Sequence, residues 1–359
     1  MDNRAQNRSR SANPHAKAMK AAKMRRKRRR RIRNTILLLF LMVVIAGAIF
    51  GVLYLKRDGK LIPLEAPYKA SKEFASTIIR KEDPKAKAFA EDLCVVDGNQ
   101  QLEGVALEQG QNGILFNVSD CKVMYANGPL KRVYPASITK IMTAMLVFKY
   151  GNMNDVVTIT QENLNLEEGS QVCGFRTGDQ LTVNQLINCL LVYSGNDAAS
   201  ALANYIGGSQ ENFVQMMNDY AASLGCTGTH FTNPHGLQDD NHYTTPYDIY
   251  LMLKEALHYP MFTEITQMPS YTVEYTRPDG IYMKTTLEAT DHYLTGEATP
   301  PRDVTVLGGK TGTTSDAGNC LALLSQNAYG KPFVSIIMGA ESKELLYQQM
   351  NSLLMHIND

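Results

Sequence analysis

Two residue pairs in the sequence have the spacing Ser-x-x-Lys, in which a lysine can take the proton of a serine hydroxyl. They are Ser137 with Lys140 and Ser119 with Lys122. In a chain of this length about one such match is expected by chance, so context must separate them. Residues i and i+3 share a face of a helix but point to opposite sides of a strand. Ser137 begins a helical pattern whereas Ser119 precedes a strand, which selects Ser137 and Lys140 as a nucleophile and its base.

A serine hydroxyl is a weak nucleophile unless a neighbouring base accepts its proton, and a lysine is a base only when it is neutral. Burial and nearby positive charge both lower the pKa of a lysine, so a second lysine at the same site would favour the neutral form of Lys140. The first turn of a helix also presents unpaired N–H groups that stabilise a developing oxyanion. Taken alone, however, Lys140 is better explained as a surface lysine. The assignment therefore depends on the two motifs that follow.

The second motif is Ser194-Gly195-Asn196, between the apolar run 186–193 and a helical pattern that starts at Asp197. A hydroxyl at such a junction can relay a proton to a leaving amine, and an Asn amide can accept from a lysine while donating to a substrate carbonyl. The triplet is weak by itself, because Ser325-Gln326-Asn327 has the same form and precedes the turn residue Gly330. Helix capping or turn formation would explain either triplet without any chemistry.

The third motif is Lys310-Thr311-Gly312-Thr313-Thr314, directly after the strand-like run VTVLGG. Lys-Thr-Gly occurs once in the chain, against a chance expectation of roughly 0.1. A lysine and hydroxyls on an edge strand can bind a substrate carboxylate, and Gly312 removes the side chain where a peptide must lie against the strand. Pairing with this edge would align the scissile bond of a peptide beside Ser137.

Helical and strand-like patterns place the three motifs in one domain. Residues 138–148 repeat apolar side chains at helical spacing, and Pro135 and Ser137 mark the start of this helix. Further helices are predicted at 184–193, 197–206, 211–224, 246–258 and 343–357. Strands are predicted at 113–118, 122–125, 271–275, 281–284, 304–309, 321–325 and 333–338. The order of hairpin, helices, antiparallel strands and last helix predicts one α/β domain whose sheet joins both ends of the domain.

All three motifs, in this order and each in a suitable local context, resemble the signature of penicillin-binding proteins and serine β-lactamases. The segment from about Asp92 to Ile357 is similar to the D-alanyl-D-alanine carboxypeptidase family of low-molecular-mass penicillin-binding proteins. The likeness extends beyond the motifs to YPASITKIMTAML, LLVYSGNDAASALA, LGCTGTHFTNPHGLQDDNHYTTPYDI and LGGKTGTTSDAGNCLAL. It implies a penicillin-binding protein/serine β-lactamase-like fold in residues 91–359, with a central antiparallel sheet flanked by helices.

The resemblance implies a serine carboxypeptidase that removes the terminal D-alanine from peptidoglycan stem pentapeptides through an acyl-enzyme. It implies no cofactor, and it implies covalent inhibition by β-lactams. The implied catalytic residues are Ser137 as nucleophile, Lys140 as base and Ser194 as proton relay. The implied substrate-binding residues are Asn196, Lys310, Thr311, Gly312 and Thr313. The backbone N–H groups of Ser137 and Thr313 would form the oxyanion hole.

Two features depart from the family pattern. Many relatives carry a C-terminal β domain and a membrane-binding end helix, whereas this sequence ends at Asp359, so we expect an N-terminal segment to provide the tether. Position 313 is Thr where members often carry a bulkier residue. The second departure leaves the substrate preference open.

The N-terminal region differs in composition from the rest. Residues 1–34 hold 14 of the 36 Lys and Arg and 1 of the 35 Asp and Glu, a net charge of +13 that leaves −12 for the remainder. This tail is predicted to be disordered. Residues 35–55 include an uncharged run of 20 residues from Ile36 to Leu55, enough to span the roughly 30 Å core of a membrane. The basic block before this run predicts a cytoplasmic N-terminus and, after a stalk at 56–90, a domain outside the cytoplasm.

Two alternatives apply to this region. Ala46-Gly47-Ala48 has the form of a signal-peptide cleavage site, but apolar residues continue to Leu55, further than a signal core requires. The run Arg25 to Arg33 could serve as a nucleic-acid-binding arm, but its position next to the apolar run favours lipid headgroups and topology as the explanation. We therefore expect a retained single-pass anchor in the cell membrane and no nucleic-acid partner.

Cysteines and histidines offer no strong metal motif. The six cysteines form no C-x-x-C pair, although Cys94 and Cys121 flank neighbouring predicted strands and could form a disulfide. His230, His235 and His242 lie around a predicted turn, without the His-x-x-x-His spacing of a helical zinc site. We expect a structural role for these histidines and no catalytic metal.

Two other functions would use the same motifs. A β-lactamase needs rapid hydrolysis of its acyl-enzyme, usually by a water that a carboxylate activates, and no Glu-x-x-x-Asn pattern lies between Asn196 and Lys310. A non-catalytic β-lactam sensor would bind covalently and signal through the membrane, but the N-terminal tail contains no signalling domain. The sequence thus favours a carboxypeptidase over both.

Overall fold

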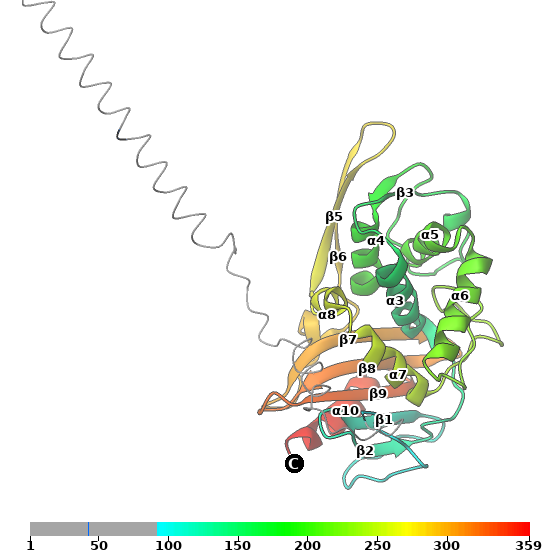
Figure 1. Ribbon diagram of the computed structural model, residues 1–359. Coiled ribbons are helices and arrows are strands. Elements are labelled where there is room, and N and C mark those ends of the chain that lie inside the picture. The colour runs from blue at the N-terminus through cyan, green and yellow to red at the C-terminus, as the bar shows by residue number, and fades with distance from the viewer. Residues whose placement is uncertain (1–41, 43–91) are drawn as a thin grey trace, which may run out of the picture. The chain divides into compact units, whose positions relative to one another are not determined.

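The computed structural model describes Met42 and residues 92–359 (Figure 1). Apart from Met42, the predictions for the tail at 1–34, the membrane anchor at 35–55 and the stalk at 56–90 fall outside the described residues. Within the described part of the chain, no helix has the length and apolar character needed to cross a membrane.

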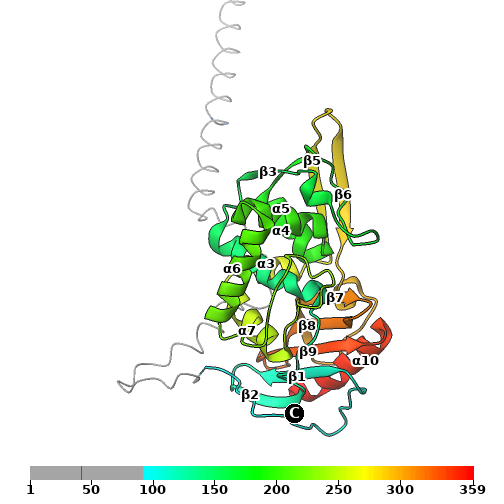
Figure 2. The same cartoon turned by 90° about the vertical axis from the view of Figure 1, so that its right-hand side faces the viewer.

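The centre of the domain is a five-stranded antiparallel sheet with the strand order β2-β1-β9-β8-β7 (Figure 1 and Figure 2). Its strands are β1 (Asn112–Asn117), β2 (Lys122–Asn127), β7 (Thr305–Thr314), β8 (Gly318–Gln326) and β9 (Pro332–Ala340). β1 pairs with β9, so strands from both ends of the domain lie side by side. This pairing confirms the prediction of a central antiparallel sheet that joins the two ends.

Alternating side chains of the sheet enter two separate cores. On β1, Ile114 and Phe116 pack into the larger core, whereas Leu115 packs into the smaller core on the opposite face. Because both faces are covered, the strand carries a continuous apolar run instead of an alternating one. The helix α10 (Lys343–Leu354) covers the smaller core, and helices from the middle of the chain cover the larger one (Figure 2).

The middle of the chain supplies this helical layer. Its elements are the 3-10 turn η1 (Ala136–Thr139), α3 (Lys140–Tyr150), α4 (Val183–Asn188), the π-helical turn η3 (Cys189–Tyr193), α5 (Asn196–Gly207), α6 (Gln210–Ser223), α7 (Pro246–Ala256) and α8 (Pro260–Thr266). Hydroxyls of Thr182, Ser209 and Thr245 accept N–H groups at the starts of α4, α6 and α7. The helix α3 is buried from Lys140 to Val147, which places the first motif in the interior of the domain.

The structure differs from the predicted elements at three places. The predicted helix 138–148 begins as the η1 turn, so Ser137 lies in a 3-10 turn just before α3. The predicted helix 184–193 divides into α4 and η3. The predicted strands at 271–275 and 281–284 form a separate hairpin, β5 (Ser270–Thr276) and β6 (Tyr282–Glu288), which projects beside the helical layer in Figure 1. A residue pattern can identify a strand, but tertiary packing selects the strand with which it pairs.

Short elements that the residue patterns did not predict fill the connections. They are β3 (Val156–Thr158), η2 (Glu162–Leu164), β4 (Gln180–Thr182) and α9 (His292–Thr295), whereas the predicted helix 343–357 is α10 followed by η4 (Met355–Asn358). None of these unpredicted elements has more than four residues, which is too short for a periodic pattern to appear. The seven residues of α8 were missed for the same reason.

Cys94 is a buried thiol. Its Sγ donates to Asn117 O at 3.5 Å, and burial raises the pKa of the thiol to about 12. The disulfide considered between Cys94 and Cys121 is therefore not formed. Cys121 lies directly before β2, whereas Cys94 precedes β1 by 18 residues and brings its thiol to a backbone carbonyl at the end of β1.

Candidate active site

The first motif brings Ser137 and Lys140 into contact. Lys140 Nζ lies 2.7 Å from Ser137 Oγ, because η1 and the start of α3 hold the two side chains one turn apart. Lys140 is fully buried and makes further Nζ contacts of 2.7 Å with Asn196 Oδ1 and with His235 O. A neutral amine can donate to this amide oxygen and this carbonyl while it accepts the Ser137 proton. The arrangement therefore suits Lys140 as a base.

Burial and a second lysine favour the neutral amine. Removal from water lowers the pKa of Lys140 well below its usual value, and the positive charge of Lys310 lowers it further. Burial also lowers the pKa of Lys310 to about 7, while the carboxylate of Asp291 acts in the opposite direction. Both causes favour the neutral amine that a base requires, with Lys310 as the neighbouring charge.

The second motif lies where η3 meets α5. Ser194 ends η3 with a φ of 68°, a left-handed conformation that is rare for a residue with a side chain. Its Oγ is buried and has no hydrogen-bond partner in the described residues, and the residue lines the same cavity as Ser137. Asn196 begins α5 and directs its Oδ1 to Lys140. A bound substrate can supply the hydrogen-bond partner that this buried hydroxyl lacks.

Asp197 fixes the loop that borders the cavity. Its carboxylate accepts from the Cys173 N–H at 3.0 Å, and the neighbouring Asn196 N–H donates to Gln171 O at 2.8 Å. A Cβ at Gly195 would lie 2.3 Å from Cys173 Sγ, so close packing at this junction requires glycine. No role was assigned to Asp197 or Cys173 from the sequence. The one indication in the sequence was that Asp197 directly follows the second motif.

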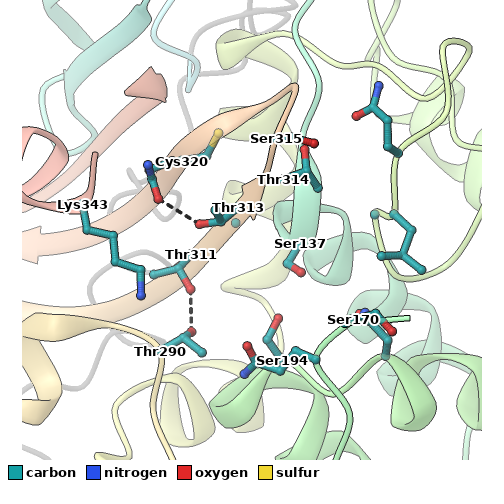
Figure 3. Close-up of a pocket in the computed structure, with 18 of the residues that line it drawn as sticks. Ser137, Ser170, Ser194, Thr290, Thr311, Thr313, Thr314, Ser315, Cys320 and Lys343 are labelled. Carbon is teal, nitrogen blue, oxygen red and sulfur yellow. Dashed lines mark hydrogen bonds between the residues drawn. The ribbon is translucent and has the colours of Figure 1, made fainter. Parts of the chain in front are cut away.

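The third motif lies on β7, an edge strand of the sheet, as predicted. Lys310 is 1% exposed, and its Nζ donates to Thr311 O at 3.0 Å. Thr311 and Thr313 line the cavity, where their hydroxyls contact Thr290 Oγ1 and Asn319 Oδ1 (Figure 3). The two threonines therefore present hydroxyls to the cavity, while Lys310 is buried on the face of β7 that Gly312 turns toward η1.

Gly312 is needed for a reason other than the predicted one. A Cβ at this position would lie 2.9 Å from Pro135 O and 3.0 Å from Ser137 N. The absence of a side chain lets β7 pass directly against η1. The glycine was expected to make room for a peptide, whereas the turn that carries the nucleophile occupies the space of a side chain at this position.

Two neutral histidines join the segment 230–243 to the nucleophile turn. His242 Nδ1 accepts from the Thr232 N–H at 3.0 Å, so its Nε2–H donates to Thr139 Oγ1 at 2.8 Å. Burial lowers the pKa of His242 to about 4 and that of His235 to about 3. The His235 carbonyl contacts Lys140 directly, so this segment holds the base in addition to Asn196.

The competing motifs lie away from this site. Ser119 is in the turn between β1 and β2, and Ser325 to Asn327 lead into the turn between β8 and β9, where the Gly330 N–H donates to Asn327 O at 3.0 Å. Neither is among the residues that line the cavity. Across residues 92–359, no three His, Cys, Asp or Glu side chains converge to hold a metal ion.

A cavity of about 430 Å³ joins the three motifs (Figure 3). Of the predicted site residues, it is lined by Ser137, Ser194, Asn196, Thr311, Gly312 and Thr313. Lys140 and Lys310 are buried and are not among the lining residues. The lining residues that sequence reasoning missed include Glu167, Glu168, Gln238, Thr290, Lys343 and Tyr347. These residues form no recognisable sequence motif, because only the tertiary fold brings them together.

We expect Gly236→Ala to reduce both stability and penicillin labelling. Gly236 has a φ of +87°, and a Cβ there would lie 1.8 Å from Ala136 O, so the loop must move away from η1. Loss of stability of about 3 kcal/mol or more is expected in urea unfolding.

Gly225 provides the matched control. It has a φ of +83° but no atom within 4 Å of its Cβ position, so Gly225→Ala should show only the cost of the left-handed conformation, about 1–2 kcal/mol. Equal effects of the two substitutions on stability and labelling would contradict the close approach of Gly236 to η1.

Comparisons with known proteins identify a family and several relatives. A family model described as D-alanyl-D-alanine carboxypeptidase, peptidase S11, matches residues 104–342. D-alanyl-D-alanine carboxypeptidase DacF of Bacillus subtilis is 30% identical over 263 residues, which cover 72% of this chain and 64% of the relative. D-alanyl-D-alanine carboxypeptidase DacC of Escherichia coli is 31% identical over 252 residues, 67% of this chain and 59% of the relative. The chain thus spans less than two thirds of the length of either relative.

Solved structures share the fold. The DD-transpeptidase of Streptomyces K15 aligns with a TM-score of 0.62 and 25% identity, over 68% of this chain and 94% of that chain. A penicillin-binding protein homologue of Mycobacterium tuberculosis aligns with a TM-score of 0.62 and 26% identity, over 71% of this chain and 94% of that chain. The predicted penicillin-binding protein-like α/β fold, with its antiparallel sheet and flanking helices, is confirmed.

Proposed function

Because the chain belongs to the D-alanyl-D-alanine carboxypeptidase family, we propose that it is a serine carboxypeptidase that removes the terminal D-alanine from peptidoglycan stem pentapeptides. The observation that carries the proposal is the contact of 2.7 Å between Ser137 Oγ and the buried amine of Lys140, beside a cavity that Ser137 lines. The chain itself thereby supplies a nucleophile and a base for acyl transfer.

In the acylation step, Ser137 Oγ attacks the carbonyl carbon between the two D-alanine residues while its proton passes to Lys140 Nζ. The backbone N–H groups of Ser137 and Thr313 stabilise the oxyanion that forms. Asn196 uses its Oδ1 to orient Lys140, which leaves its amide nitrogen to donate to the substrate carbonyl. The product of this step is an ester of Ser137.

Release of D-alanine needs a proton on its amine, and we assign to Ser194 the relay of this proton from Lys140. The buried, unpartnered Ser194 Oγ supports this role. Water then attacks the ester, restores the Ser137 hydroxyl and leaves a carboxylate on the shortened peptide. One peptide bond is broken and one water is consumed in the cycle.

The edge strand β7 is proposed to orient the substrate. The hydroxyls of Thr311 and Thr313 face the cavity and can donate to the terminal carboxylate, and Gly312 lets this strand lie against the nucleophile turn. Lys310 was assigned to the same carboxylate from the sequence, and from its buried position next to Thr311 it contributes its positive charge to this site. A β-lactam carries both a reactive amide and a carboxylate, so we expect it to acylate Ser137.

Incubation of the full-length protein, in detergent, with a stem pentapeptide ending in D-Ala-D-Ala should release one D-alanine per peptide. A coupled D-amino acid oxidase assay measures the product, and a peptide ending in D-Ala-L-Ala serves as the control. Stable penicillin labelling without any D-alanine release would instead support a β-lactam sensor.

We also propose that the apolar run Ile36 to Leu55 anchors the protein in the cell membrane with its catalytic domain outside the cytoplasm. The support is the uncharged length of this run and the basic block before it. The full-length protein should remain in the membrane pellet after an alkaline carbonate wash, and protease added to spheroplasts should digest the domain. Recovery in the soluble fraction, or complete protection from protease before lysis, would refute this topology.

A further inference from the structure

Ser194 has a left-handed backbone, unlike Ser137 and Lys140. A residue with a Cβ keeps a φ of 68° only where neighbouring contacts hold it there. The buried Oγ of Ser194 has no hydrogen-bond partner in the described residues, so the side chain does not fix its own position. Hydrogen bonds of the flanking residues must therefore determine where this hydroxyl points.

Gln171 makes two of the hydrogen bonds that flank Ser194. Its side-chain Nε2 donates to Tyr193 O, directly before Ser194, and its backbone carbonyl accepts the Asn196 N–H at 2.8 Å. The third bond runs from the Gly195 N–H to Cys189 O at 3.2 Å. Figure 3 shows Ser170, the neighbour of Gln171, beside Ser194 at the border of the cavity. One residue thus contacts the chain on both sides of the left-handed position.

The segment that follows Gln171 is fixed to the start of α5. The buried carboxylate of Asp197 accepts the Cys173 N–H at 3.0 Å through Oδ1 and the Gly174 N–H at 3.1 Å through Oδ2. Close packing of Cys173 Sγ against Gly195 adds a further contact between the two segments. Gln171 is therefore held in one position relative to the second motif, and it can hold Ser194 in turn.

We propose that Gln171 is a positioning residue for the proton relay, because its side chain fixes the Tyr193 carbonyl and with it the peptide group that sets the direction of Ser194 Oγ. The assignment rests on the carboxypeptidase function proposed above. During release of D-alanine, Lys140 Nζ gives a proton to Ser194 Oγ while the hydroxyl proton of Ser194 passes to the leaving nitrogen. The C–N bond breaks with its electron pair on that nitrogen, and Lys140 returns to its neutral form.

The relay is needed only when the leaving atom is a nitrogen. An amine leaves with a proton, whereas a thiolate can leave without one. A change that displaces the Ser194 hydroxyl should therefore slow the reactions of peptides and β-lactams, whose scissile bonds are amides. The same peptide with a thioester in place of the scissile amide should react as before. This difference separates a role in the relay from a general loss of structure.

Gln171→Met removes the Nε2–H donor and keeps about the same side-chain length. In the full-length protein in detergent, kcat/KM for a pentapeptide ending in D-Ala-D-Ala should fall about tenfold, and so should the rate constant for acylation of Ser137 by benzylpenicillin. The kcat/KM for the thioester should change less than about twofold. The control is Gln100→Met, which removes an exposed side chain whose Nε2 donates to Val123 O at 2.8 Å, outside the cavity lining. It should leave all three rates unchanged.

A second measurement asks whether Gln171 acts through Ser194. In a Ser194→Ala background, Gln171→Met should cause no further loss with the pentapeptide, because the hydroxyl that it positions is already absent. Losses that multiply in the double variant, equal losses with the pentapeptide and the thioester, or unchanged amide rates in Gln171→Met would each overturn the assignment. A wild-type protein that releases no D-alanine would refute the proposed function instead. The same pair of substitutions, measured by benzylpenicillin acylation, then decides the role of Gln171 independently.

Discussion

Ser137→Ala is expected to abolish penicillin labelling and to lower the rate of D-alanine release by on the order of 10⁴-fold or more. The substitution removes the oxygen that lies 2.7 Å from Lys140 Nζ, so no acyl-enzyme can form. Lys140 keeps its contacts with Asn196 and His235, and the protein should therefore remain folded. Mass spectrometry of the intact labelled protein and of its peptides measures the adduct, and circular dichroism checks the fold.

Ser119→Ala is the matched control, because Ser119 and Lys122 have the same spacing in the sequence. Ser119 lies in the turn between two strands, outside the cavity lining, and no hydrogen bond in the described residues joins it to Lys122. Labelling and D-alanine release should stay near the wild-type values. A penicillin adduct on Ser119, or full D-alanine release by Ser137→Ala, would disprove the assignment of the nucleophile.

The second large effect concerns the lifetime of the acyl-enzyme. We expect D-alanine release from the pentapeptide to be about 10⁴-fold faster than hydrolysis of the penicillin adduct, which corresponds to roughly 5.5 kcal/mol of barrier. After a peptide reacts, D-alanine leaves and makes room for water beside the ester carbon. The opened penicillin ring remains attached and keeps that space filled. The adduct should therefore last for minutes or longer on the same protein that turns over the peptide rapidly.

The lifetime of the adduct also distinguishes this enzyme from a β-lactamase. The contacts of Lys140 Nζ are to Ser137, Asn196 and His235, none of which is a carboxylate. Asp197 is near, but its carboxylate accepts backbone N–H groups of the loop at Cys173. A water at the ester thus lacks a dedicated carboxylate base among these groups.

Two carboxylates in the cavity make this prediction testable in more detail. Glu167 and Glu168 line the cavity although they precede the second motif, so a search between the second and third motifs does not find them. The decay of the adduct can be followed by mass spectrometry in the wild type and in a variant with Glu167→Gln and Glu168→Gln. A slow decay that is similar in both proteins is expected. Fast, repeated turnover of penicillin that the double substitution abolishes would instead identify a β-lactamase.

The sequence determined the features of this protein that depend on local geometry and on the order of the motifs. Ser137 and Lys140 are three residues apart, and any helical turn brings such residues together whatever the rest of the chain does. Pro246 at the start of α7 and Gly208, which ends α5 with a φ of 73°, act in the same local way, because a missing N–H group and a left-handed conformation affect only one turn. The α/β class followed from the same local periodicities, and the likeness to a known family followed from the three motifs and their flanking residues.

Tertiary structure decided which distant groups complete the site. Lys140 meets Asn196 across 56 residues and the His235 carbonyl across 95, and a backbone carbonyl leaves no trace in residue type. The passage of β7 against η1 explains Gly312, and the same packing places Lys343 in the cavity lining beside Thr311. The burial that lowers the pKa values of Lys140 and Lys310 is likewise a property of the packed domain. Sequence patterns report the geometry of one or two turns. Contacts between distant segments depend on how the sheet packs between its two helical layers. No local pattern encodes that packing.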